Sequence, residues 1–277
     1  MNAVTTQASW PAALSDYSHH LRARGLAASS IGWYRGRLRA LAARYPDTGP
    51  WDLTPRDLVR WLDGLAPNTR RAYRKAVVGF YGWAVREGLT TEDPSRNVPR
   101  VPEALPRPRP VREADYAAAL ALAPSERDRL LVQVAGDLGL RRAEVARVHV
   151  DDLHDEVDGW WLTVHGKGAK VRSLPVPDEL ADALLAAGAA TGWVFPGRTG
   201  GHLSADTVGR YLARVLPAGY SAHKLRHRFA TRAYALERDV CAVQELLGHA
   251  KPATTAVYVQ TTIGSMRSTL EALERAR

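Results

Sequence analysis

The sequence predicts a mainly α-helical protein with one small antiparallel β-sheet, divided into two domains. Apolar residues recur at spacings of three and four along most of the chain, which is the periodicity of one face of an α-helix. Around residues 160–176 this pattern gives way to strand-like segments. The 277 residues also exceed the roughly 150–200 residues of most single domains. We therefore expect two hydrophobic cores rather than one.

The first domain, expected over residues 1–93, contains four predicted helices. Apolar periodicity and the breaks between periodic segments place them at residues 10–24, 29–45, 55–65 and 68–88. The expected N-terminal caps are Ser29 or Ser30 for the second helix, Thr54 for the third and Asn68 for the fourth. Thr54 is followed by a proline, which is favoured at the first helical position.

Prolines separate the two domains. Six of the seventeen residues at 94–110 are proline, and no helix tolerates that content, because proline lacks an amide hydrogen and clashes with the preceding turn. We expect an extended linker there, made basic by arginines that include Arg107 and Arg109. The second domain is expected over residues 111–277.

The second domain is predicted to be helical on either side of a β-hairpin. Helices are expected near residues 113–122 and 125–138, and again from residue 178 with several breaks. Between them, residues 160–165 and 171–176 are strand-like and flank the turn Gly166-Lys167-Gly168. A last helix, at 265–275, carries an apolar stripe that could pack on its own domain or on a neighbouring molecule.

The excess positive charge is concentrated in the first third of the chain. Residues 1–100 hold 15 basic and 8 acidic residues, whereas residues 101–277 hold 23 and 21. The fourth helix begins with cations that oppose the helix dipole, namely Arg70, Arg71, Arg74 and Lys75. A phosphate backbone would stabilise them, although a solvated face or a codon bias toward arginine would also give this composition. We interpret these four residues as candidate DNA contacts.

Several classes of protein are excluded by composition. The single Cys241 excludes an intramolecular disulfide framework and is typical of a reducing compartment. The N-terminus lacks the basic start and apolar stretch of a signal peptide, and no uncharged stretch is long enough to cross a bilayer. We expect a cytoplasmic protein without a membrane partner.

Four short motifs in the second domain contain candidate catalytic residues, and each is weak alone. Arg141 and Glu144 are three residues apart, so they can pair on a helical turn. Lys167 lies in a hairpin turn that lacks the glycine spacing of a Walker phosphate loop. The other two motifs are His223-Lys224-Leu225-Arg226-His227, and Leu246-Leu247-Gly248-His249 followed by Tyr258.

The histidines of the third motif also raise a zinc hypothesis. His223 and His227 are four residues apart on one helical face, and His249 could be a third ligand. Arg226 would lie beside that cation, and the glutamate of a metalloprotease is missing. Arginine and imidazole suit a phosphate better, since guanidinium offers a planar, permanent charge to phosphate oxygens. We therefore expect no metal.

Taken in chain order, these motifs resemble those of the tyrosine recombinase (phage integrase) family. The matching patterns are Gly-Leu-Arg-x-x-Glu, the Gly-Lys-Gly hairpin, His-x-Leu-Arg-His, and Leu-Leu-Gly-His with a tyrosine nine residues after its histidine. The residues at the family's six catalytic positions are Arg141, Lys167, His223, Arg226, His249 and Tyr258. The resemblance covers nearly the whole chain. It implies an N-terminal core-binding domain and a catalytic domain that form a clamp around DNA.

This resemblance implies a site-specific recombinase that cleaves and rejoins DNA through a 3′-phosphotyrosyl intermediate, without metal, ATP or other cofactor. Attack on a phosphate builds negative charge that cations must neutralise, and the tyrosine proton must be removed. The resemblance implies that Tyr258 is the nucleophile, that Arg141 and Arg226 neutralise the phosphate, and that Lys167 is the general acid. It implies that His223 contacts the phosphate or accepts the tyrosine proton. His249 is implied to donate a hydrogen bond to the phosphate, and Glu144 to orient Arg141.

The resemblance also implies partners. They are a double-stranded DNA recombination site and other copies of the chain, expected as a tetramer on paired sites joined through the C-terminal helix, or a related recombinase subunit. The early start of the first helix favours a simple Xer-like or mobile-element integrase. Two alternatives stay open, a type IB topoisomerase-like enzyme and a DNA-binding architectural protein whose catalytic residues are unused.

Overall fold

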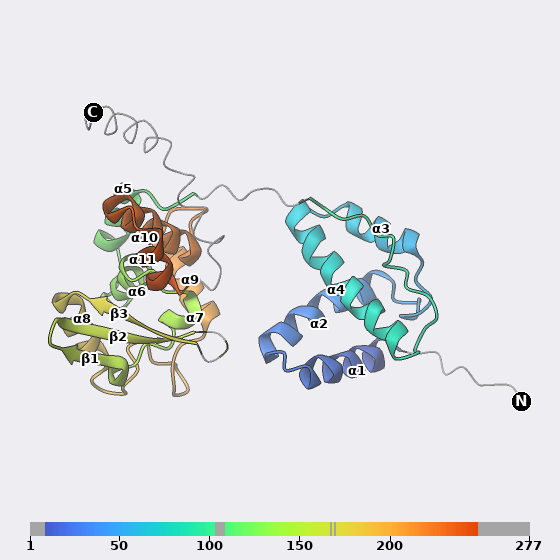
Figure 1. The fold of residues 1–277 in the computed structure, drawn as a ribbon, viewed down its shortest axis with the longest axis horizontal. Helices are drawn as coiled ribbons and strands as arrows, with labels where there is room; N and C mark the ends of the chain where they lie inside the picture. Colours follow the sequence, from blue (N-terminus) through green and yellow to red (C-terminus); the bar gives the residue numbers. More distant parts are fainter. Residues whose placement is uncertain (1–8, 103–108, 167, 169, 249–277) are drawn as a thin grey trace, which may run out of the picture. The chain divides into compact units, whose positions relative to one another are not determined.

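The computed structural model of the chain describes residues 9–102, 109–166, 168 and 170–248. The chain divides into two compact units, Met1–Leu105 and Pro106–Arg277. Figure 1 shows the helices of the first unit and the mixed helices and strands of the second.

Within residues 9–102 the regular structure is entirely helical. The helices are α1 Trp10–Ala23, α2 Ala28–Arg44, α3 Pro55–Asp63 and α4 Pro67–Arg86. Their shared core is rich in aromatic rings, and Phe80 of α4 is fully buried at its centre. Trp10 and Trp51 both stack on Phe80, with ring centroids 5.8 and 5.3 Å away. Large aromatic surfaces of this kind supply much of the apolar burial in a small helical unit.

One of the three predicted helix caps is confirmed, and two are wrong. Thr54 caps α3, forming a capping box in which its hydroxyl accepts from the amide of Asp57 and the Asp57 carboxylate accepts from the amide of Thr54. The second helix instead begins after Ala27, and the fourth after Ala66, neither with a side-chain cap. In α4, proline at the first helical position has a backbone already suited to a helix, so Asn68 lies inside the first turn.

The first part of the expected linker packs on the first unit. Val98 is 4% exposed and belongs to the core of that unit. Its carbonyl oxygen accepts a hydrogen bond from Nε of Arg74 on α4, at 2.9 Å. The described residues 99–102 and 109–112 form neither helix nor strand.

The second unit packs helices against a small sheet (Figure 1). The helices are α5 Glu113–Ala121, α6 Glu126–Asp137, α7 Arg142–Val145, the 3-10 turn η1 Val150–Asp152, α8 Asp178–Gly188, α9 Ala205–Val215, α10 Ala222–Glu237 and α11 Val240–Leu247. The strands are β1 Leu153–Glu156, β2 Gly159–His165 and β3 Val171–Val176. Alternate residues of β2 and β3 are buried in the core, as expected for strands with one covered face.

The sheet has the order β1-β2-β3 and is antiparallel throughout. The predicted hairpin is confirmed, with Trp160 opposite Val176 and His165 opposite Val171. The sequence did not predict β1, because a segment with three polar residues out of four has no strand-like alternation. Its pairing with β2 is a tertiary contact that local pattern does not encode.

The predicted fold class, mainly helical with a small antiparallel sheet, is thus confirmed. In the part of the chain that the structure describes, no helix combines the length and apolar character needed to traverse a membrane.

Candidate active site

Arg141 and Glu144 lie at the start of α7 and form the predicted ion pair. The Glu144 carboxylate accepts hydrogen bonds from the backbone amide and from Nη1 of Arg141, both at 2.8 Å. The side chain of Glu144 is 2% exposed, whereas that of Arg141 is 45% exposed. Arg141 therefore has a fixed base and a guanidinium that reaches solvent, as an anion-binding side chain requires.

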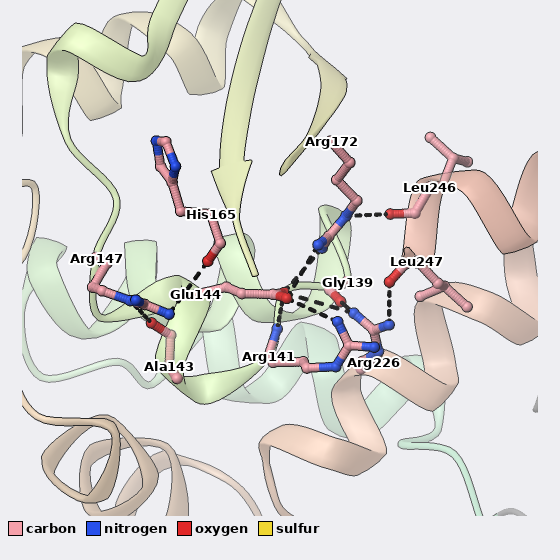
Figure 2. Close-up of polar contacts among 10 residues, drawn as sticks. All are labelled: Gly139, Arg141, Ala143, Glu144, Arg147, His165, Arg172, Arg226, Leu246 and Leu247. Carbon is pink, nitrogen blue, oxygen red and sulfur yellow. Dashed lines mark hydrogen bonds and ion pairs between the residues drawn. The ribbon is translucent and has the colours of Figure 1, made fainter. Parts of the chain in front are cut away.

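Glu144 also binds Arg172 of β3 and lies near Arg226 of α10 (Figure 2). Arg172 donates to both carboxylate oxygens, at 3.1 and 2.9 Å, and Nη1 of Arg226 is 3.8 Å from Oε2. Burial alone would raise the pKa of Glu144, but hydrogen bonds from Arg172 and from the Arg141 amide outweigh it and lower that pKa to about 2. Three guanidinium groups thus surround one ionised carboxylate and leave an excess of positive charge.

Arg226 is almost fully buried, at 2% exposure, and joins three segments. Its Nη1 donates to the carbonyl of Gly139, in the loop before α7, at 2.6 Å. Its Nη2 donates to the carbonyl of Leu247 at the end of α11. The backbone of Gly139 has φ +61°, and a Cβ there would lie 2.5 Å from the ring of Phe229, so this approach requires glycine.

His223 lies close to Arg141 and Arg226. Burial, followed by the positive charges of Arg226 and Arg141, lowers the pKa of His223. Its ring meets that of His227 edge to face, with centroids 4.3 Å apart. Burial and the neighbouring His223, Arg226 and Lys224 lower the pKa of His227 to about 4. Both imidazoles are therefore neutral near pH 7.

The structure brings together Arg141, Glu144, His223 and Arg226 from the predicted site. The remaining predicted catalytic residues, Lys167, His249 and Tyr258, lie outside the described residues. The hairpin turn itself is closed by a hydrogen bond of 2.7 Å from the amide of Gly166 to the carbonyl of Lys170. Within residues 9–102, 109–166, 168 and 170–248, no group of three or more histidine, cysteine or acidic side chains could hold a metal ion.

The predicted DNA contacts of α4 differ in their surroundings. Arg70 donates to the carbonyl of Asp63 and forms an ion pair with its carboxylate at 3.6 Å, and Arg74 is bound to Val98. Lys75 is exposed and, with Arg71, lines a hollow of about 680 Å³ that also includes Tyr34, Asn68, Arg74 and Arg100. In the linker, Arg109 is exposed and Arg107 lies outside the described residues.

Comparison with known proteins decides the family. Residues 111–263 match the model of the phage integrase family. Tyrosine recombinase XerC of Xanthomonas campestris pv. campestris (strain B100) is 30% identical over 272 residues, which cover 89% of this chain and 83% of that protein. The XerC protein of Azotobacter vinelandii is 34% identical over 245 residues, covering 80% and 74% of the two chains.

The chain belongs to the phage integrase family of tyrosine recombinases. Solved structures agree in fold. A lambda integrase dimer bound to a COC′ core site superposes with a TM-score of 0.74, at 21% identity, over 89% of this chain and 75% of the other. XerH recombinase in a post-cleavage complex with its palindromic difH substrate gives a TM-score of 0.72, at 20% identity, over 94% and 84%.

Sequence reasoning missed Arg172 of the recombinase, although a signal for it exists. Arg172 is two residues before Leu174 and four before Val176, so all three lie on the same face of β3. Leu174 and Val176 are buried in the core. A charged residue in register with two core residues of a strand indicates a buried ionic partner, which here is Glu144.

Proposed function

We propose that this site-specific tyrosine recombinase uses Tyr258 to cleave DNA strands through a 3′-phosphotyrosyl intermediate and then rejoins them. The phosphotyrosyl bond conserves the energy of the phosphodiester, so the reaction needs no ATP, and guanidinium groups neutralise the phosphate in place of a metal ion. The observation that carries the proposal is the convergence of Arg141 and Arg226 on Glu144, with His223 in the field of both arginines, in a chain of this family.

Arg141 and Arg226 neutralise the nonbridging oxygens of the scissile phosphate in this proposal. Attack by a hydroxyl increases the charge on those oxygens, and preorganised cations in a partly dry site stabilise that charge strongly. The excess of guanidinium groups over carboxylate at Glu144 supports this role. Glu144 orients Arg141 through its two hydrogen bonds.

Proton transfer is assigned to His223 and Lys167, and a further hydrogen bond to the phosphate is assigned to His249. An unperturbed tyrosine has a pKa of about 10, so Tyr258 must lose its proton during attack. His223, neutral because its pKa is lowered, accepts that proton or contacts the phosphate. Lys167 protonates the departing 5′ oxygen, and His249 donates to a nonbridging oxygen.

We propose that the first domain, residues 1–93, and the linker, 94–110, hold duplex DNA against the catalytic domain, 111–277, as a clamp. Cations that release counterions from phosphates give sequence-independent affinity. The supporting observations are the exposure of Lys75 and Arg109 and the basic hollow beside α4. Arg71 and Arg107 are assigned to the same contacts.

The partners that we propose are a double-stranded recombination site and further copies of the chain. Lambda integrase has been solved as a dimer on a core site and as a tetramer on a Holliday junction. By analogy, we assign this chain to a tetramer on paired sites, joined through the helix that the sequence predicts at 265–275, or to an assembly with a related subunit. The cytoplasm, where Cys241 would stay reduced, is the proposed compartment.

The first test is covalent capture of DNA. The protein is incubated with nicked duplexes of randomised sequence, and DNA that stays attached after denaturation is recovered and sequenced, which also yields its site. We expect Tyr258→Phe to bind that site with wild-type affinity and to form no adduct. An adduct from Tyr258→Phe would refute the nucleophile.

The same substrates distinguish the alternatives. If the chain is an architectural protein, neither the wild-type protein nor Tyr258→Phe will form an adduct. A topoisomerase-like enzyme would relax supercoiled plasmids without the selected site, whereas a recombinase requires paired sites and yields recombinant products.

A further inference from the structure

The C-terminal end of α11 is held by two arginines that come from different elements. Nε of Arg172 on β3 donates to the carbonyl of Leu246 at 3.0 Å, and Arg226 on α10 donates to the carbonyl of Leu247. These are the last two carbonyls of the helix, which have no partner within it. The helix dipole also favours cations at this end.

Arg172 joins this helix end directly to Glu144. Its two terminal nitrogens donate to the two carboxylate oxygens while Nε donates to Leu246, so one planar guanidinium bridges α7 and α11 (Figure 2). The side chain of Arg172 is 13% exposed and that of Glu144 is 2% exposed. A bidentate pair protected from solvent in this way fixes position as well as charge.

Gly248 completes the junction. It ends α11 in the left-handed region, with φ +61°, and a Cβ at this position would lie 2.9 Å from Cδ of Arg172. The absence of a side chain lets the helix end approach the arginine. The next residue along the chain is His249, which is proposed to donate a hydrogen bond to the phosphate.

We propose that Arg172 is a positioning residue for DNA cleavage. It sets the end of α11, and with it the start of the segment that contains His249, against the carboxylate that orients Arg141. This inference rests on the proposed function, because it assumes that Arg141 and His249 act on one phosphate.

The expected consequence is a defect in the chemical step rather than in DNA binding. A misplacement of about 1 Å in reacting groups can lower a rate about 100-fold. Lysine at position 172 would keep a cation beside Glu144, but its single ammonium cannot reproduce a planar bidentate pair together with a third bond. Arg172→Lys should therefore fold and bind DNA while cleaving slowly.

The test compares Arg172→Lys with Arg228→Lys on the duplex selected by covalent capture. Arg228 of α10 is a matched control, since it too is buried, forms a bidentate pair, with Glu113 at 2.9 and 2.7 Å, and donates to a backbone carbonyl, that of Gly136. The affinity for DNA and the rate of adduct formation at saturating DNA are measured well below the midpoint of unfolding of each variant.

We expect Arg172→Lys to lose about 100-fold in adduct formation with little change in affinity, and Arg228→Lys to cleave at close to the wild-type rate. A duplex with sulfur as the bridging 5′ atom tests the route of the effect, since a thiolate needs no protonation to depart. This duplex should restore cleavage by Lys167→Ala but not by Arg172→Lys.

Two results would overturn the inference: wild-type cleavage by Arg172→Lys, or its recovery on the sulfur-bridged duplex, which would assign the defect to the lysine hairpin. If the wild-type protein itself forms no adduct, the proposed function fails instead.

Discussion

The two histidines of α10 show how neighbouring residues set the protonation of a site. His223 and His227 are four residues apart, and each lies within the field of Arg226. Burial and that positive charge favour the uncharged imidazole, which has one ring nitrogen able to accept a proton. The same arginines that suit a phosphate thus keep His223 in the form that a proton acceptor needs.

The lowered pKa of His227 has a consequence for stability. Its pKa is about 4 in the folded protein against an ordinary value of 6.5, so between these values the unfolded chain binds a proton that the folded chain does not. The free energy of unfolding should therefore fall as the pH is lowered from about 6.5 toward 4, and should not change with this group at higher pH. One histidine contributes at most about 1.4 kcal/mol per pH unit, and less here because solvent reaches the ring.

Chemical denaturation across pH 4–7 measures this dependence. His227→Gln should flatten the slope, whereas His154→Gln, at an exposed histidine of β1, should leave it close to that of the wild-type protein. Equal slopes for the wild-type protein and His227→Gln would contradict the assignment.

At the scale of elements, the sequence predicted what local periodicity encodes and missed what depends on tertiary contact. The helices and the β2–β3 hairpin follow from apolar spacing and turn residues. Strand β1 forms only by pairing with β2. Ser29 and Asn68 do not cap their helices, because these helices begin earlier than the sequence pattern predicts. In the site, the pair Arg141–Glu144 was predictable from a spacing of three residues, whereas Arg172 is 28 residues from its carboxylate.

The loop between α6 and α7 places a carbonyl for Arg226 and depends on Gly139. Alanine there would adopt a left-handed conformation, which costs roughly 1–2 kcal/mol, and its Cβ would overlap the ring of Phe229. Overpacking of this kind costs about 1–3 kcal/mol more. Gly139→Ala should therefore lower the midpoint of thermal unfolding and slow DNA cleavage.

Gly219→Ala separates the two causes, since Gly219 has φ +85° but open space around its Cβ position. The control should show only the conformational cost in a thermal melt. Equal losses for the two variants would mean that the contact with Phe229 relaxes without cost.

At the scale of the whole molecule, the excess positive charge divides into internal and external tasks. Arg70 and Arg74 of α4 bind the chain's own backbone at Asp63 and Val98. Arg172 likewise holds a carbonyl and a carboxylate inside the second unit. Net charge therefore overstates the cations available to DNA, and position along α4 alone does not distinguish the two kinds.

This division predicts different salt dependences for variants of one helix. If Lys75 contacts a phosphate, Lys75→Ala should weaken binding to a duplex of random sequence. The negative slope of log affinity against log salt should also become less steep, by about 0.9. Arg86→Ala removes a similar charge from the exposed C-terminal end of α4, away from the basic hollow, and should leave that slope unchanged. Fluorescence anisotropy over a salt series measures both. Identical slopes for the two variants would show that the hollow beside α4 does not bind the DNA backbone.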